Sequence, residues 1–164
     1  MSIASHQLEH EALDVLKSEI ISLTPRAFTS LAVEVILTLR YGSHNIPEES
    51  DPEFVNVKNV IIRDPLGLDT IYVRACHRTM DHVGEPEILD FVNSMGALKK
   101  GIYITDGDFT QEAVKFAENS EKTINLIDLA QLTQIMNRFN IGLKIHRLME
   151  IKMIDHTFFD ELEL

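Results

Sequence analysis

The segment VNVKNVIIRDPLGLDTIYVRACHR, residues 55–78, constrains the fold most, because two alternating apolar runs flank a tight-turn signal. In the first run Val55 and Val57 alternate with polar residues, and Val60 and Ile62 alternate again in the opposite phase. The phase changes at positions 58 and 59, which predicts a β-bulge there. Asp-Pro-Leu-Gly then places Pro and Gly where a turn between two strands uses them.

The second run of this segment predicts a strand with two distinct faces. Ile71, Val73 and Ala75 alternate with Tyr72, Arg74 and Cys76, and successive side chains of a strand point to opposite faces. We therefore expect a β-hairpin in which Arg74 and Cys76 share one face. Lys58 or Asn59 is expected beside them, and the sequence leaves that choice open.

Length and composition indicate one soluble globular domain spanning residues 1–164, with 45% hydrophobic and 25% charged residues. No apolar run approaches the roughly 18 residues of a membrane span. The amino-terminal residues MSIASHQLEHEALD have neither the basic start nor the apolar core of a secretory signal. A single cysteine excludes an internal disulfide and favours a reducing, cytoplasmic setting.

The charge balance argues against strong nucleic-acid binding. The chain carries 15 Lys and Arg against 26 Asp and Glu, a formal net charge of −11. Affinity for DNA comes largely from cationic side chains on phosphates, so the overall field repels a polyanion, although a local basic patch stays compatible with it.

Two helices are predicted before the hairpin, over residues 3–22 and from Pro25 to about Arg40. Thr24-Pro25 supplies an N-cap followed by Pro at the first helical position. His6 and His10 have metal-ligand spacing on the first helix, but no third ligand follows at a recognisable position, so a solvated face is favoured. Residues 41–54 are expected to form a loop with four acids.

The remainder of the chain alternates between helix and strand patterns. We expect a polar connection over 77–86, a helix over 86–98 and a buried strand at 101–105. A helix capped by Asp108 then runs to Glu118, followed by a strand over 123–127 and a helix capped by Asp128 that ends near 139. This alternation predicts a mixed α/β sheet covered on both faces. Phe158 and Phe159 in the tail are expected to dock on the body or on a partner.

The hairpin motif VIIRDPLGLDTIYVRAC, followed by VGEPEILDFVNSMGALKKGIYITDGDFTQEAVKFAE, resembles the catalytic domain of Mrr-type restriction endonucleases over nearly the whole chain. The resemblance implies a restriction endonuclease-like fold and cleavage of DNA, often methylated DNA. It also implies an Asp on the first hairpin strand, Gln-x-Lys or Glu-x-Lys on the second, and a Glu directly after the Phe of the second helix. The family's usual amino-terminal winged-helix domain is expected to be absent.

The chain departs from this pattern at each catalytic position. Gln-Ala-Lys falls on Arg74, Ala75 and Cys76, the Asp falls on Lys58 or Asn59, and the helix Glu falls on Thr29. Cleavage by this fold requires oxygen ligands for Mg²⁺ and a cation at the scissile phosphate. These substitutions predict an inactive pseudonuclease that needs no cofactor.

The replaced residues still permit other roles. Lys58, Arg74 and Arg78 could form a pocket for a phosphate or nucleic acid, but pairing with the chain's many acids is favoured. Cys76 could act as a nucleophile, but a buried inert thiol is favoured, because His77 points to the other face of the strand.

Three functions therefore compete. The first is a non-catalytic domain in a restriction or defence context, acting by protein or DNA binding as a homodimer or with an Mrr-like nuclease. The second is an active Mg²⁺-dependent endonuclease with relocated or partner-supplied catalytic residues. The third is a cysteine-dependent activity unrelated to DNA. The scaffold residues fit the pattern of the resembling family whereas the site residues do not, and this combination favours the first function.

Overall fold

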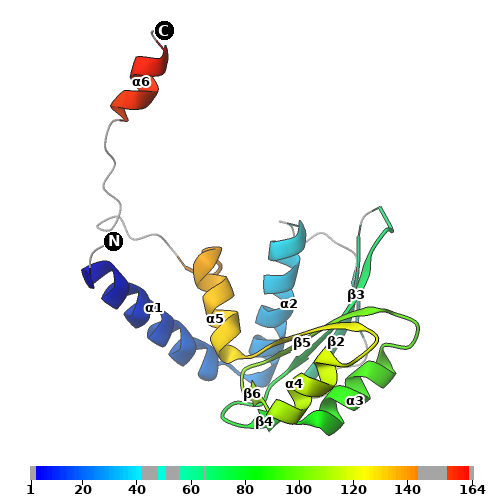
Figure 1. Cartoon of the computed structure of the whole chain (residues 1–164). Helices are drawn as coiled ribbons and strands as arrows, with labels where there is room; N and C mark the ends of the chain where they lie inside the picture. Colours follow the sequence, from blue (N-terminus) through cyan, green and yellow to red (C-terminus); the bar gives the residue numbers. More distant parts are fainter. Residues whose placement is uncertain (1–2, 42–47, 51–55, 65, 144–154, 163–164) are drawn as a thin grey trace.

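The computed structural model of this chain describes residues 3–41, 48–50, 56–64, 66–143 and 155–162. Its centre is a five-stranded sheet in the order β1-β2-β3-β5-β7, accompanied by a two-stranded sheet of β4 and β6 (Figure 1). The strands are β1 Glu48–Ser50, β2 Val57–Arg63, β3 Thr70–Cys76, β4 His82–Val83, β5 Lys100–Thr105, β6 Asp108–Phe109 and β7 Thr123–Ile127. The predicted mixed α/β architecture is confirmed.

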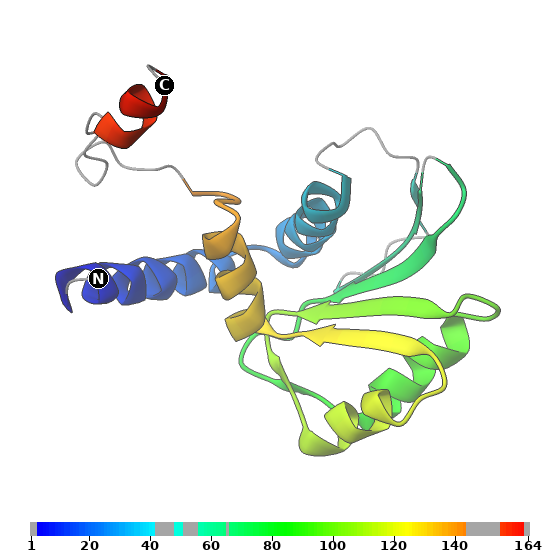
Figure 2. The same cartoon turned by 45° about the horizontal axis from the view of Figure 1, so that its top comes forward.

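Helices cover both faces of the large sheet, as Figure 2 shows from a second direction. The helices are α1 Ile3–Ile21, α2 Pro25–Tyr41, α3 Glu85–Ser94, α4 Gln111–Glu118, α5 Leu129–Arg138 and α6 His156–Leu162. Helices α1, α2 and α5 bury apolar side chains against one face, and α3 and α4 cover the other. Among the described residues, no helix has both the length and the hydropathy needed to cross a membrane.

The first core cluster explains the placement of α2. Phe28, Ala32, Val35 and Ile36 recur at helical spacing and are fully or almost fully buried, which is the pattern of a helix with one face against a sheet. The helix begins as predicted, because the Thr24 hydroxyl accepts a 3.2 Å hydrogen bond from the backbone N–H of Ala27.

The predicted bulge in the hairpin is wrong. Strands β2 and β3 pair antiparallel without interruption from Val57↔Cys76 to Arg63↔Thr70. The change of phase arises because both faces of the hairpin are covered by helices. Apolar residues therefore occur on either side of β2, with Val60 and Ile62 in one core cluster and Ile61 packed against the other.

The turn of this hairpin follows the sequence expectation and also connects other elements. The backbone N–H of Gly67 donates 2.8 Å to Asp64 O, and Gly67 has φ +71°, a left-handed conformation that Gly adopts without strain. Asp69 at the end of the turn accepts from Arg40 of α2 at 2.7 Å and from Lys100 of β5 at 3.0 Å. These contacts connect α2, the hairpin and strand β5.

Three parallel strands define the edge on which the polar residues gather. β3 pairs parallel with β5 and β5 pairs parallel with β7, so their carboxyl ends meet at one edge of the sheet. The residues that follow these strands are His77, Asp106 and Asp128. Such edges are where ligand sites of open α/β sheets usually form.

Several predicted boundaries need correction. The expected loop over 41–54 contains β1, which pairs antiparallel with β2. The expected polar connection over 77–86 contains β4, which pairs parallel with β6. Asp108 lies in β6, and the N-cap of α4 is instead Thr110, whose hydroxyl accepts from the N–H of Ala113 at 3.1 Å. These very short strands carry too few residues to show a period.

Candidate functional site

The guanidinium of Arg74 is the best-fixed cation on the α3 side of the sheet. Arg74 is only 8% exposed. Its Nε donates to Asn59 Oδ1 at 2.7 Å, its Nη1 to Asp90 Oδ2 at 2.9 Å and its Nη2 to Ser94 Oγ at 3.2 Å. All three guanidinium nitrogens thus have partners from the protein, and the Asp90 carboxylate balances the charge.

Strand β2 and helix α3 supply the partners of Arg74, and the strand pairing and the helical repeat explain why they meet it. Asn59 is the residue directly opposite Arg74 in the β2–β3 pairing, so both side chains point to the same face. Asp90 and Ser94 lie four residues apart on α3 and therefore share the helix face above the strand. The ring of Phe91 lies 5.5 Å from the guanidinium carbon and adds a cation–π contact.

The structure divides the five altered positions between the two faces of the sheet. Asn59, Arg74 and Cys76 lie on the α3 face. Lys58 pairs with Ala75, whose side chain belongs to the opposite core cluster. Thr29 is buried on α2, on that same opposite side, and its hydroxyl donates to Arg26 O at 3.1 Å. Asn59, and not Lys58, is therefore the neighbour of Arg74.

Cys76 is 4% exposed. It lies in an open pocket of about 340 Å³ whose lining residues are Val57, Arg74, Cys76, Arg78, Pro86, Glu87, Asp90 and Tyr103. Burial raises the pKa of Tyr103 well above its ordinary value, and contact with Cys76 acts in the same direction. The floor of this pocket thus consists of a buried thiol and a buried phenol.

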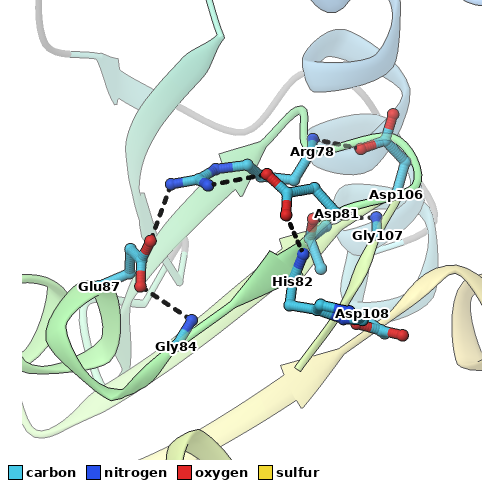
Figure 3. Close-up of polar contacts among 9 residues, drawn as sticks. Arg78, Asp81, His82, Gly84, Glu87, Asp106, Gly107 and Asp108 are labelled. Carbon is cyan, nitrogen blue, oxygen red and sulfur yellow. Dashed lines mark hydrogen bonds and ion pairs between the residues drawn. The ribbon is translucent and has the colours of Figure 1, made fainter. Parts of the chain in front are cut away.

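Arg78 is held at the rim of the same pocket by two acids (Figure 3). Its Nη2 lies 2.8 Å from Glu87 Oε1, and its Nη1 lies 3.3 Å from Asp81 Oδ2. Glu87 also accepts from the N–H of Gly84 at 2.8 Å, which anchors the start of α3. Arg74 and Arg78 therefore share a pocket, whereas the third predicted phosphate-binding residue, Lys58, does not line it.

Asp106 forms the most buried polar network of the described residues, and the sequence analysis did not single it out. It is 1% exposed and follows the last residue of β5. It accepts from the Arg78 N–H at 2.6 Å and from Thr79 Oγ1 at 2.7 Å, and its Oδ2 lies 2.7 Å from His77 Nδ1. The sequence signal that could have identified Asp106 is its position directly after the buried strand GIYIT.

Gly107 brings the β5–β6 connection into contact with the segment after β3. A Cβ built on Gly107 would lie 2.3 Å from both Arg78 O and Asp81 O. No side chain fits this space, so the two segments approach as closely as their backbones allow. The N–H of Asp108 donates to Asp81 O at 3.1 Å and continues the contact.

Beside this contact lies a pocket of about 520 Å³ with several acids in its lining, among them Asp81, Asp108 and Asp128. His82 in the same lining contacts the Asp108 carboxylate, which raises the pKa of the imidazole above its ordinary value of 6.5. In the described part of the chain, no three His, Cys, Asp or Glu side chains are arranged to hold a metal ion.

The acids of the 41–54 segment remain largely outside this description. Glu48 and Glu49 belong to β1 by their backbone. Asp51 and Glu53 lie outside the described residues.

Known proteins with a similar sequence are restriction enzymes. Residues 20–136 match the Mrr_cat family, described as a restriction endonuclease. The type IV methyl-directed restriction enzyme EcoKMrr of Escherichia coli (strain K12) is 27% identical over 161 residues, covering 96% of this chain and 52% of that protein. The chain thus spans about half the length of this relative.

Two solved structures with a similar fold are restriction endonucleases. The DNA modification-dependent restriction endonuclease AspBHI aligns with 80% of this chain and 36% of its own, at a TM-score of 0.57 and 10% identity. MspJI restriction endonuclease, solved in complex with a 27-mer oligonucleotide, aligns with 77% of this chain and 30% of its own, at a TM-score of 0.52 and 15% identity. The match over residues 20–136 decides the family: this chain belongs to the Mrr_cat restriction endonuclease family.

Proposed function

We propose that this chain is an Mrr-type restriction endonuclease domain that does not cleave DNA and acts by binding a protein partner in a restriction context. The observation that carries the proposal is the Arg74 guanidinium, fixed by Asn59, Asp90 and Ser94. By the resemblance, this position holds a Gln or Glu in the active pattern. A buried, immobilised cation thus stands where the metal-binding surface of an active enzyme would be.

The electrostatic reason follows from the charges involved. Mg²⁺ is bound in proteins through oxygen ligands, chiefly carboxylates, carbonyls and waters. Arg74 is only 8% exposed, and a divalent cation within a few ångströms of it would experience strong repulsion, because burial lowers the effective dielectric constant. The nearest acid on α3, Asp90, already pairs with Arg74 at 2.9 Å.

The neighbouring position supports the same proposal. By the resemblance, Cys76 falls at the position of the catalytic Lys, and its side chain is only 4% exposed. A thiol cannot supply the positive charge that stabilises the developing charge at a scissile phosphate. Loss of several members of one catalytic unit has precedent for rate losses of about 10⁶.

The chemistry of the partner follows from the charge of the chain. A net charge of −11 disfavours a polyanionic ligand. A protein partner, either a second copy of this chain or an Mrr-like nuclease, is therefore preferred over DNA. A domain that keeps the fold of its relatives but lacks their chemistry could form mixed, inactive assemblies with them.

The alternative function is an active Mg²⁺-dependent endonuclease with relocated or partner-supplied catalytic residues. Family membership favours it, because the relative from Escherichia coli is named as a methyl-directed restriction enzyme. The acids of the 41–54 segment are the candidates for relocated ligands.

Plasmid nicking separates the two functions. The purified chain is incubated with methylated and unmethylated supercoiled plasmid in Mg²⁺ and in Mn²⁺. The proposal predicts that the supercoiled form persists in every condition. Nicking that is absent from a chelated sample, and from Glu48→Gln/Glu49→Gln/Asp51→Asn/Glu53→Gln protein purified in parallel, would establish the alternative. Nicking that the variant retains equally would indicate a contaminating nuclease.

A chemical reversion tests the role of Arg74 directly. The variant Lys58→Asp/Arg74→Gln/Cys76→Lys restores the hairpin residues of the active pattern if its Asp falls on Lys58. A second variant carries Asn59→Asp in place of Lys58→Asp, for the case in which the Asp falls on Asn59. Cleavage gained only in a restored variant would support the lost-site explanation. Cleavage restored by Cys76→Lys alone would instead mean that metal ligands are already present elsewhere.

A further inference from the structure

Helix α6, in the described part of the carboxyl-terminal segment, has an apolar face that is exposed to solvent. In α6, Phe158 and Phe159 are each 54% exposed and Leu162 is 67% exposed. The two rings contact each other edge to face, with centroids 5.3 Å apart. An isolated helix of only seven residues is unstable in water, so this helix needs a surface against which to pack.

One groove on the body offers an apolar surface of suitable chemistry. It lies between the outer strand β7 and helix α5 and measures about 480 Å³. Its lining combines the apolar Ile102, Leu126, Ile127, Ile135 and Phe139 with the polar Asn125, Gln131, Gln134 and Arg138. Phe139 is 54% exposed at the end of α5. An exposed aromatic residue beside aliphatic ones is the usual signature of a contact surface.

The charge of its lining distinguishes this groove from two other pockets of the body. The α6 segment carries Asp155, Asp160 and Glu161 and no Lys or Arg. Among the described residues, Arg138 is the only charged one that lines the β7–α5 groove. The pocket against α1 includes Glu11 and Glu19, and the 520 Å³ pocket at the carboxyl edge of the sheet includes several aspartates. An acidic helix is therefore attracted to the first and repelled by the other two.

Arg138 is available for such a contact. Within the described residues, the contact found for its guanidinium is with the ring of Phe139, 5.5 Å from the ring centroid. No ion pair with a described acid engages it. A carboxylate from α6 would add charge-assisted hydrogen bonds without displacing an existing partner.

The connection is long enough for α6 to reach the groove of its own chain. Residues 144–154 link Leu143 to Asp155, and twelve residue steps span at most about 40 Å. A domain of this length has a radius of gyration of about 15 Å. The groove begins at the end of α5, only a few residues before the linking segment. A short tether gives an intramolecular partner a millimolar effective concentration.

We propose that α6 docks by its Phe158, Phe159 and Leu162 face into the β7–α5 groove of the same chain, with its acids against Arg138. This contact covers the exposed edge strand β7. Open strand edges promote association between chains, so the docked helix would keep that edge from pairing. The proposal does not depend on whether the domain cleaves DNA.

The chain contains no Trp, so a single introduced Trp gives a clean test. In Phe158→Trp protein, docking predicts an emission maximum at shorter wavelength than that of N-acetyltryptophanamide, and severalfold weaker quenching by acrylamide. Adding Arg138→Glu or Phe139→Asp should return both signals to those of exposed Trp. Val15→Asp is the matched control, because Val15 is 62% exposed in the α1 pocket and its replacement should leave the emission unchanged.

A charge reversal and a dilution series complete the test. Asp160→Lys/Glu161→Lys in the Arg138→Glu background should restore the protected emission. Emission of the parent Phe158→Trp protein equal to that of free Trp would overturn the proposal. Protection that disappears on dilution, together with loss of a dimer in light scattering, would also overturn it, because the groove would then be filled by a second copy.

Discussion

Arg74 Nε donates a 2.7 Å hydrogen bond to Asn59 Oδ1, and the same two residues face each other in the β2–β3 pairing. Two positions that we predict to depart from the active pattern are thus hydrogen-bonded to each other. On the proposal above, the amide of Asn59 accepts from a cation where the active pattern has a metal-binding Asp. This hydrogen bond helps explain how Arg74 can be buried, at 8% exposure, between strand β3 and helix α3.

Replacing Arg74 by Gln should destabilise the domain. The shorter side chain loses the contacts with Asp90 and Ser94, and we expect the free energy of unfolding to fall by about 1–3 kcal/mol. Urea denaturation followed by circular dichroism gives this value. Asp90→Asn is the matched control, since Asp90 is 72% exposed and an exposed pair contributes less than about 1 kcal/mol. Equal losses in the two variants would contradict the importance given to the buried guanidinium.

Asp106→Asn should be among the most damaging single-atom changes. Asp106 accepts from Arg78 and Thr79 and also contacts His77, and an amide NH₂ would direct hydrogens at one or both of the two donors. We expect a loss of about 2–4 kcal/mol in unfolding free energy, because a buried donor is left without an acceptor. Asp108→Asn changes an exposed acid of the same edge, and a loss there as large as for Asp106→Asn would contradict this view.

Gly107→Ala should distort the carboxyl edge of the sheet. The added Cβ would lie 2.3 Å from two backbone oxygens, so the backbone must move, at an expected cost of about 3 kcal/mol or more. Gly96→Ala is the control, since Gly96 has φ +58° but no atom near its Cβ position, and backbone strain alone costs about 1–2 kcal/mol. Thermal unfolding of both variants should rank Gly107→Ala well below Gly96→Ala.

The His82–Asp108 pair predicts a specific pH dependence. Hydrogen bonding to Asp108 raises the pKa of His82 above 6.5, so the pair favours the folded state fully below that pH. The contribution is lost as the pH rises through the folded pKa. In an NMR titration, the His82 imidazole should show a midpoint above 6.5, and Asp108→Asn should return it toward 6.5. An unchanged midpoint in the variant would contradict the pairing.

Elements with a clear period were predictable from the sequence. The hairpin faces, the Thr24 N-cap and the Asp128 N-cap all follow from local patterns, and the Asp128 carboxylate accepts from the N–H of Gln131 at 2.9 Å. The prediction of a bulge was wrong because both faces of the hairpin are buried. In such a hairpin, a change in the phase of the apolar residues does not mark a change in the register of the strand pairing. The start of helix α4 was misplaced because Asp108 and Phe109 form a strand with β4, and this pairing has no local signal in the sequence.

The candidate site was predictable only in part. Strand alternation placed Arg74 and Cys76 on one face, but it could not choose between Lys58 and Asn59. That choice depends on the register of a strand pairing between positions fifteen residues apart. The Asp106 network was missed because its donors come from the segment after β3, and a contact so distant in sequence has no local signal.

Calorimetric titration of the wild-type chain with Mn²⁺ tests the central claim most directly, because the DNA cleavage that the resemblance implies depends on a bound divalent cation. The Arg74 network predicts no saturable heat up to millimolar Mn²⁺ for the wild-type chain. Saturable binding with a micromolar Kd in the wild-type chain would contradict the account, since a metal site would then exist despite the immobilised guanidinium.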